Sequence, residues 1–188
     1  MDQIIKHPKI LNRETTGLLI IDIQERILPV INENERVIEN AIKLIKAFNI
    51  LNLPVFLTEQ YPKGLGQTTE IIQKELKNYS PIHKMTFSCS GAEGLFQSIK
   101  GSELKQIVVC GIETHVCVQQ TVMDLLANGF QVNLAADAVS SRKQFDYEIA
   151  LKRMQTLGAE ITTTESILFE VLSVCGTPEF KEISKIVK

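Results

Sequence analysis

Short apolar runs alternate with longer segments of helical periodicity along this chain. Four runs are rich in aliphatic and β-branched residues and end at polar or glycine positions, a pattern typical of strands that are buried on both faces of a sheet. These runs are residues 17–22, 54–60, 106–111 and 130–137. Weaker strand candidates are residues 79–84 and 159–164.

The intervals between these runs carry helical signals. Thr114 is placed to cap a helix that ends near Gly129, and Thr177 with Pro178 fits the N-cap and first position of a C-terminal helix. Gly158 fits the position just past another helix end. Two apolar stripes at helical spacing are Val37, Ile38, Ala41, Leu44, Ile45 and Phe48, and Tyr147, Ala150, Leu151, Met154 and Leu157.

Strands that alternate with helices predict right-handed βαβ units and a mainly parallel sheet. A chain of 188 residues can bury one sizeable core. No linker rich in proline, glycine or serine divides it, and it contains no internal repeat. We therefore expect residues 1–188 to form a single three-layer α/β domain.

Composition narrows the functional classes. The net charge of −2 gives no electrostatic footprint for nucleic acid or for an anionic membrane. No apolar run approaches the ~20 residues of a membrane span, and residues 1–17 lack the apolar segment of a secretory signal. These features predict a cytoplasmic protein that binds neither nucleic acid nor membranes.

The four cysteines show no CxxC or Cys/His spacing of a metal site. In a cytoplasmic chain we expect free thiols, and by default each one is a small buried hydrophobe. The sequence therefore predicts neither disulfides nor a metal centre.

In open α/β sheets, ligands bind beyond the carboxyl ends of the strands. The predicted strands end at Asp22, at Gln60 and Tyr61, at Lys84, and just before Cys117. We expect Gln60 and Tyr61 to contact the substrate, and Tyr61 opens a Pro- and Gly-containing segment, residues 61–66, that suits a lid or pocket wall. We expect Asp137, at a further strand end, to order the turn at residues 140–142.

Cys110 and Cys117 have different expected roles. Cys110 lies inside a strand and is expected to be core, whereas Cys117 would be the third residue of a helix capped by Thr114. A thiol at a helix N-terminus has a lowered pKa, and Lys84 would lower it further. Asp22 could carry the proton, which would make an acyl-transfer site. Each residue also has a structural reading: a capping Asp, a solvated Lys and a packed Cys.

Three blocks resemble signature motifs of the isochorismatase-like cysteine hydrolases. They are LLIIDIQERIL, the segment around Lys84 (HKMTFSCSG), and CGIETHVCVQQTVMDLLANGFQVNLAADAVSSR. TEQYPKGLG, SGAEG and ITTTESILFE are similar to one branch, the isochorismatase domain-containing proteins. The resemblance implies a Rossmann-like fold with a six-stranded parallel sheet, flanked by helices, and a catalytic triad of Asp22, Lys84 and Cys117.

The resemblance also implies an activity. Family members hydrolyse amide or carbamoyl C–N bonds, or the vinyl ether of isochorismate, and the presence of Cys117 favours C–N hydrolysis through a cysteine thioester. The Asp-x-His metal motif of nicotinamidases is replaced here by Thr58-Glu59-Gln60-Tyr61, so no cofactor is expected. Two alternatives remain: a redox-responsive thiol protein that uses Cys117, for which Cys110 would be a poorly placed partner, and a non-catalytic binding or assembly protein.

The segment before Cys117 should also supply oxyanion donors. We expect a cis peptide bond between Ile112 and Glu113, because an all-trans turn points successive N–H groups in different directions. The resemblance implies the same bond. The candidate donors are the N–H groups of Glu113 and Cys117. A homo-oligomer is also expected, because Phe145 lies opposite the apolar stripe of its helix, among charged residues.

Overall fold

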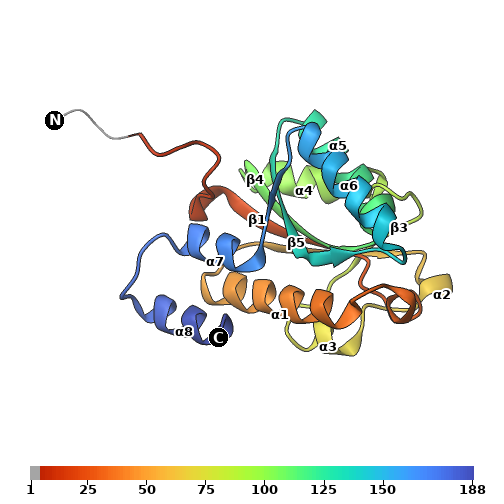
Figure 1. The fold of residues 1–188 in the computed structure, drawn as a ribbon, viewed down its shortest axis with the longest axis horizontal. Helices are drawn as coiled ribbons and strands as arrows, with labels where there is room; N and C mark the ends of the chain where they lie inside the picture. Colours follow the sequence, from red (N-terminus) through yellow and green to blue (C-terminus); the bar gives the residue numbers. More distant parts are fainter. Residues whose placement is uncertain (1–4) are drawn as a thin grey trace.

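A six-stranded parallel sheet forms the middle layer of the structure, a computed structural model that describes residues 5–188 (Figure 1). The strand order is β3-β2-β1-β4-β5-β6. The strands are β1 Thr16–Ile21, β2 Val55–Gln60, β3 Ile82–Lys84, β4 Gln106–Ile112, β5 Gln131–Ser140 and β6 Glu160–Thr162. This arrangement confirms the predicted fold, a three-layer Rossmann-like α/β architecture with helices on both sides of the sheet.

Helices cover both faces of the sheet. In Figure 1, α1, α7 and α8 lie on one face and α4, α5 and α6 on the other. The helices are α1 Asn34–Ile50, α2 Pro62–Leu65, α3 Glu70–Gln73, α4 Leu95–Gly101, α5 Gln119–Ala127, α6 Gln144–Thr156, α7 Thr164–Leu172 and α8 Pro178–Ile186. Short helical turns are η1 Arg13–Thr15, η2 Leu28–Val30 and η3 Cys89–Gly91, and η4 Thr114–Val118 is a π-helical segment.

The central strands are apolar throughout because both of their faces are covered. In β1, Leu18 and Ile20 pack on the core beneath α1, whereas Leu19 and Ile21 pack on the core beneath α4 and α5. This alternation follows from the two-residue repeat of a strand. The continuous apolar runs of the sequence are therefore a direct signal for the middle of the sheet.

Strand order reverses at the centre of the sheet. β1 pairs with β2 on one side and with β4 on the other. The connection from β1 to β2 passes through α1 on one face, and the connection from β4 to β5 passes through α5 on the opposite face. Because the two connections diverge, a crevice opens beyond the carboxyl ends of β1 and β4.

The sequence signals at two helix ends are confirmed. Thr177 is the N-cap of α8 and its hydroxyl oxygen accepts a hydrogen bond from the Phe180 N–H, with Pro178 at the first position. Gly158 follows the end of α6 with φ +105°, a conformation that glycine adopts without steric penalty. Among residues 5–188, no helix is long and apolar enough to cross a membrane.

The predicted cap at Thr114 is wrong. β4 runs on to Ile112, and the helical winding already begins at Thr114, so Glu113 is the N-cap residue. The Thr114 hydroxyl is buried and has no hydrogen-bond partner among the described residues. Cys117 is therefore the fourth residue of the winding instead of the third, and it enters α5 through a π-helical segment.

Gly111 fixes the close approach of β4 to β1. Its φ is +120°, and a Cβ atom at this position would lie 2.0 Å from the carbonyl oxygen of Ile21. Any other residue would collide with the β1 backbone. The strand end that precedes Cys117 can therefore reach the crevice only with glycine at this position.

Candidate active site

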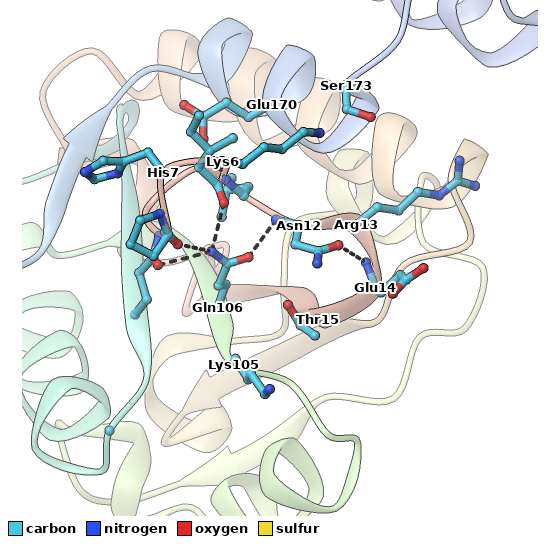
Figure 2. A pocket seen from close by; sticks show the side chains of 15 residues that line it. Lys6, His7, Asn12, Arg13, Glu14, Thr15, Lys105, Gln106, Glu170 and Ser173 are labelled. Atoms are coloured by element: carbon cyan, nitrogen blue, oxygen red, sulfur yellow. Dashed lines mark hydrogen bonds between the residues drawn. The ribbon is translucent and has the colours of Figure 1, made fainter. Parts of the chain in front are cut away.

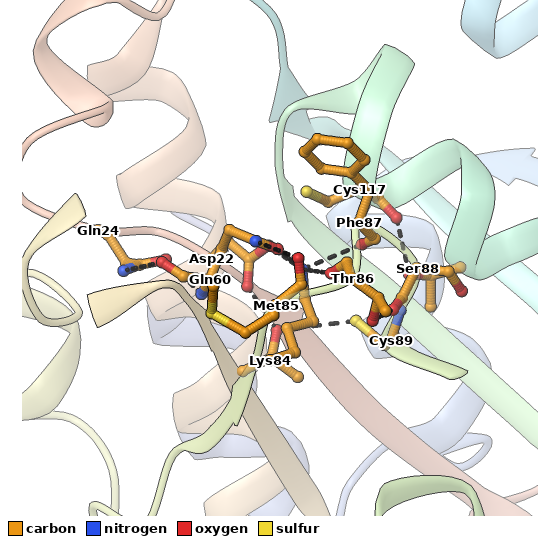
Figure 3. Close-up of polar contacts among 12 residues, drawn as sticks. Asp22, Gln24, Gln60, Lys84, Met85, Thr86, Phe87, Ser88, Cys89 and Cys117 are labelled. Carbon is orange, nitrogen blue, oxygen red and sulfur yellow. Dashed lines mark hydrogen bonds and ion pairs between the residues drawn. The ribbon is translucent and has the colours of Figure 1, made fainter. Parts of the chain in front are cut away.

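Asp22, Lys84 and Cys117 come together at the carboxyl edge of the sheet (Figure 3). Asp22 follows β1, Lys84 ends β3, and Cys117 lies in η4 directly after β4. Asp22 and Cys117 line one cavity of about 100 Å³. Lys84 is buried behind Asp22, so the carboxylate lies between the cavity and the cation.

A buried ion pair forms the base of this site. Lys84 Nζ lies 2.6 Å from Asp22 Oδ2, and only 0% and 4% of the two side chains are exposed. The Thr58 hydroxyl on β2 donates to Asp22 Oδ1 at 2.8 Å. Asp22 directly follows the strand and has φ 52°, in the left-handed region.

The Lys84 ammonium group has further partners. Nζ donates to Gln60 Oε1 at 2.8 Å, to the Phe87 carbonyl at 3.0 Å and to the Thr86 carbonyl at 3.3 Å. The Gln60 Nε2 group donates to the Met85 carbonyl at 3.0 Å. Both ends of the Gln60 amide are thus engaged within the protein, and Gln60 positions the lysine.

Gln24 holds this network in place, and the sequence reasoning missed it. Its Oε1 accepts from the Gln60 N–H at 2.7 Å, and its Nε2 donates to the carbonyls of Gln60 at 3.0 Å and Gly66 at 2.7 Å. Gln24 is completely buried. A glutamine two positions after Asp22, just past the first apolar strand, was the available signal.

The predicted low pKa of Cys117 is wrong. Burial, and then the nearby Asp22 carboxylate, raise the pKa of the Cys117 thiol to about 12, and Lys84 only partly opposes this effect. The prediction considered the helix N-terminus and the lysine but not the loss of water around the sulfur. The resting thiol is therefore protonated and needs a base.

Asp22 and Lys84 also have shifted pKa values. Burial raises the pKa of Asp22, and the favourable interactions with Lys84 and Thr58 do not fully offset it. Burial disfavours the Lys84 ammonium, but the nearby acidic groups, Asp22 foremost, outweigh it and raise the pKa of Lys84. A carboxylate with a raised pKa next to a thiol is suited to accept its proton.

Apolar side chains make most of the cavity wall. Gln60 and Glu113 complete the lining with Asp22 and Cys117, and the apolar members are Ile27, Leu65, Phe87, Ile112 and Val116. Tyr61, predicted as a substrate-binding residue, lies outside this lining. Its ring instead covers Gly64, where an added Cβ would lie 2.3 Å from Tyr61 Cδ1. Tyr61 itself has a left-handed φ of 39°.

The segment between β4 and Cys117 is tied to the chain after β5. The Ile112–Glu113 peptide bond is cis. The Glu113 carboxylate accepts from the Arg142 backbone N–H at 3.1 Å and from Arg142 Nε at 3.0 Å. Asp137, expected to order this turn, instead accepts from the N–H and hydroxyl of Thr164 at the start of α7.

A second thiol lies at the site, and sequence reasoning had treated it as packing. Cys89 in η3 is fully buried, and its sulfur lies 3.7 Å from the Thr58 hydroxyl. Its N–H donates to the Thr121 hydroxyl, which in turn donates to the Cys117 carbonyl. Burial, and then Asp22, raise the pKa of Cys89 to about 11. Cys110 instead packs in the core on the α1 face.

A larger hollow of about 740 Å³ lies at the opposite edge of the sheet (Figure 2). Gln106, at the start of β4, is its centre. Its Oε1 accepts from the Asn12 N–H at 2.6 Å, and its Nε2 donates to the Ile10 carbonyl at 3.1 Å. These bonds fasten the N-terminal segment to the sheet, which gives the hollow a structural explanation.

Metal-ligating side chains do not gather anywhere in the described part of the chain: residues 5–188 contain no group of three or more His, Cys, Asp and Glu that could hold an ion.

Exposure predicts the order in which the cysteines are alkylated. Cys175 is exposed, whereas Cys117 is buried and its pKa is raised to about 12. Because the thiolate is the reactive form, we expect iodoacetamide at pH 7 to modify Cys175 at least ~10-fold faster than Cys117. Labelling of Cys117 in a Cys175→Ser variant should rise steeply between pH 7 and pH 10. Time-resolved peptide mass spectrometry measures both rates, and faster labelling of Cys117 at pH 7 would contradict the raised pKa.

Comparison with known proteins agrees with this geometry. The isochorismatase domain model matches residues 16–166. Isochorismatase domain-containing protein 2 of Danio rerio is 40% identical, over 94% of this chain and 88% of that protein. The structure of MAR1 ribonuclease from Caenorhabditis elegans has a TM-score of 0.89 and 36% identity, over 94% of this chain and 91% of that one.

A more distant structure shares the fold alone. The YcaC gene product of Escherichia coli, described as an octameric hydrolase of unknown specificity, has a TM-score of 0.88 and 20% identity, over 97% of this chain and 92% of that one. The parallel sheet and the buried Asp22–Lys84 pair at its carboxyl edge define an isochorismatase-like hydrolase fold. The chain belongs to the isochorismatase family.

Proposed function

We propose that this protein hydrolyses the C–N bond of a small amide or carbamoyl compound with Cys117 as the nucleophile. The observation that carries the proposal is the shared cavity of Cys117 and Asp22, with Lys84 buried behind the carboxylate. A nucleophile, a base and a cation that holds the base have the arrangement that covalent acyl transfer requires.

In the first half of the reaction, the Cys117 thiol gives its proton to Asp22 while the sulfur attacks the substrate carbonyl carbon. A C–S bond forms and the carbonyl electron pair moves to oxygen. The tetrahedral intermediate collapses, the C–N bond breaks, and protonated Asp22 gives its proton to the departing nitrogen. The raised pKa of Cys117 fits this order, because deprotonation is coupled to attack.

In the second half, water attacks the thioester carbonyl and Asp22 accepts a proton from that water. The C–S bond breaks, the acid product leaves, and the proton returns from Asp22 to the sulfur. Lys84 keeps the same position throughout and favours the ionised form of Asp22 each time the carboxylate is regenerated.

The developing oxyanion needs donors near the sulfur. We assign this role to the backbone N–H groups of Glu113 and Cys117. The Val116 and Val118 N–H groups both donate to the Glu113 carbonyl, so the segment winds tightly around Glu113 on either side of Cys117. Ile112 is the apolar wall beside these donors. Loss of one such donor typically costs ~10²–10³-fold in rate.

Intact-protein mass spectrometry during turnover of an amide and carbamoyl library tests the proposal. We expect an acyl adduct on Cys117, released ammonia or amine, and no adduct in Cys117→Ala. Cys110→Ala is the matched control, because Cys110 packs away from the cavity. An RNA substrate belongs in the same assay, since one similar structure carries a ribonuclease name. Cleavage of RNA that survives Cys117→Ala, without any amide turnover, would refute the proposal.

A second candidate function is favoured by Cys89. In a redox-responsive thiol protein, peroxide would oxidise Cys117 to a sulfenic acid, and Cys89 is a second buried thiol at the same site. This function requires peroxide consumption and does not require Lys84. Peroxide turnover by a Lys84→Met variant that has lost amide hydrolysis would support it over the hydrolase.

We also propose that the protein forms a homo-oligomer through α6. Phe145 is 71% exposed and Ile149 is half exposed on the outer side of this helix. Buried aromatic anchors are typical of protein–protein interfaces. We expect Phe145→Glu to reduce the mass measured by light scattering at micromolar concentration. Lys181→Glu on α8, an exposed residue at the other face of the sheet, is the control, and a monomeric wild-type protein would refute the proposal.

A further inference from the structure

We infer that the cavity selects short, uncharged aliphatic amides, an inference that rests on the proposed function and narrows its substrate class. Three features of the cavity carry it. These are its volume, the engagement of its polar side chains by other protein groups, and the apolar character of its wall.

The volume limits the acyl chain. The cavity measures about 100 Å³. An apolar cavity of ~150 Å³ holds one benzene molecule, so this one is too small for an aromatic ring beside the reacting amide. An acyl chain of about two to four carbon atoms fills such a space at normal packing density.

Among residues 5–188, no lysine or arginine lines the cavity to receive a substrate carboxylate. The Lys84 side chain is fully buried, with Asp22, Gln60 and two carbonyl oxygens around Nζ. The Gln60 amide is engaged at both ends, by Lys84 and by the Met85 carbonyl. A carboxylate that entered would lose its water without gaining a partner among the described residues.

The charged groups that face the cavity are already neutralised. Asp22 is paired with Lys84, and Glu113 is paired with Arg142. Their negative ends repel a substrate carboxylate, and their existing partners reduce the attraction for an ammonium group. The five apolar side chains of the wall stabilise neither charge. An uncharged acyl chain is the group that this wall accommodates.

Phe87 sets the size limit at the mouth. It lines the cavity and is 55% exposed, whereas Ile112, which also lines the cavity, is 1% exposed. Figure 3 shows its ring beside Cys117. Because the Phe87 side chain is partly exposed to solvent, it can be truncated to alanine without creating a cavity in the buried core.

Matched pairs of primary amides test this selection by ammonia release at pH 7. Propionamide and glycinamide have the same size but the second is cationic, and isobutyramide and oxamate have similar shapes but the second is anionic. We expect kcat/KM for each uncharged amide to exceed that of its charged partner by at least ~100-fold, given the cost of an unpaired charge in an apolar site. Benzamide should be slower than propionamide by at least ~10-fold.

The outcomes separate the inference from the proposed function. The selection would be overturned if oxamate, glycinamide or benzamide had a kcat/KM equal to or above that of the short uncharged amide with which it is compared. If that turnover depends on Cys117, the proposed hydrolase function stands. Failure to hydrolyse any amide, or turnover that persists in Cys117→Ala, would refute both. The expected ranking of kcat/KM values, with Cys117-dependent turnover, supports both the selection and the proposed hydrolase function.

A variant pair tests the role of the mouth. We expect Phe87→Ala to raise the ratio of benzamide to propionamide turnover at least ~10-fold, because the removed ring leaves room for the substrate's ring. Met85→Ala is the control, since Met85 is 72% exposed nearby but does not line the cavity. An unchanged ratio in Phe87→Ala, or an equal change in both variants, would contradict the assignment of Phe87.

Discussion

Replacing Asp22 with asparagine should lower amide turnover by about 10²–10⁴-fold, the usual contribution of a general acid–base. Burial, and then the Asp22 carboxylate, raise the pKa of the Cys117 thiol to about 12, so the thiol needs a base near neutral pH. Asparagine keeps the shape of Asp22 but accepts no proton, so both the attack and the departure of nitrogen lose their proton carrier. Steady-state ammonia release, with the intact-mass adduct as a second measurement, tests this expectation.

The same variant should remain folded. Lys84 Nζ would keep Gln60 Oε1 and the carbonyl oxygens of Thr86 and Phe87 as acceptors, and the side-chain oxygen of the new asparagine could still accept from Thr58. Circular dichroism and a thermal melt provide the control. Near-wild-type turnover in folded Asp22→Asn would remove Asp22 from the mechanism and leave the redox-responsive function as the better candidate.

Replacing Lys84 with methionine should destabilise the protein as well as inactivate it. Methionine fills a similar volume but leaves the buried Asp22 carboxylate without its cation. Breaking one side of a buried ion pair costs about 3–5 kcal/mol in unfolding free energy. We expect a loss of this size by urea denaturation. Wild-type stability in Lys84→Met would show that the pair does not stabilise the fold.

The stability loss should depend on pH. Burial already raises the pKa of Asp22 in the folded protein, and without Lys84 it rises further. A carboxyl group with a raised folded pKa favours folding when protonated, and this contribution is lost as the pH rises through that pKa. The difference in unfolding free energy between Lys84→Met and the wild type should therefore increase with increasing pH. For the double variant Asp22→Asn/Lys84→Met, the difference in unfolding free energy from the wild type should be smaller and independent of pH, since no carboxylate is left unpaired.

The sheet could be predicted because its signal is local. Buried parallel strands read as continuous apolar runs, and the runs at residues 17–22 and 106–111 mark β1 and β4 within two residues at each end. The shortest strands, β3 and β6, gave weaker signals because three residues leave little room for a pattern. The cap at Thr114 was misplaced by one residue, since a hydroxyl near a strand end does not reveal where the backbone begins to wind.

The site was predictable only as far as strand ends define it. Asp22, Lys84 and Cys117 could be placed at one edge from topology and from resemblance, and the structure brings them together. The pKa of Cys117 depends on how much water the fold excludes, which its position in a helix does not reveal. Gln24 and Cys89 were missed because their partners lie in distant parts of the sequence.

The Gln24 hydrogen bonds have a consequence for the energetics of substrate binding. They tie the end of β2 to Gly66, and the Glu59 carboxylate holds Thr68 by its N–H and hydroxyl groups. The wall that carries Leu65 is thus anchored on the strands before any ligand arrives. The conformational entropy of this wall segment is lost during folding, so substrate binding does not have to order the segment again. The cavity is preorganised, so even a substrate of few atoms can be held in a reactive orientation.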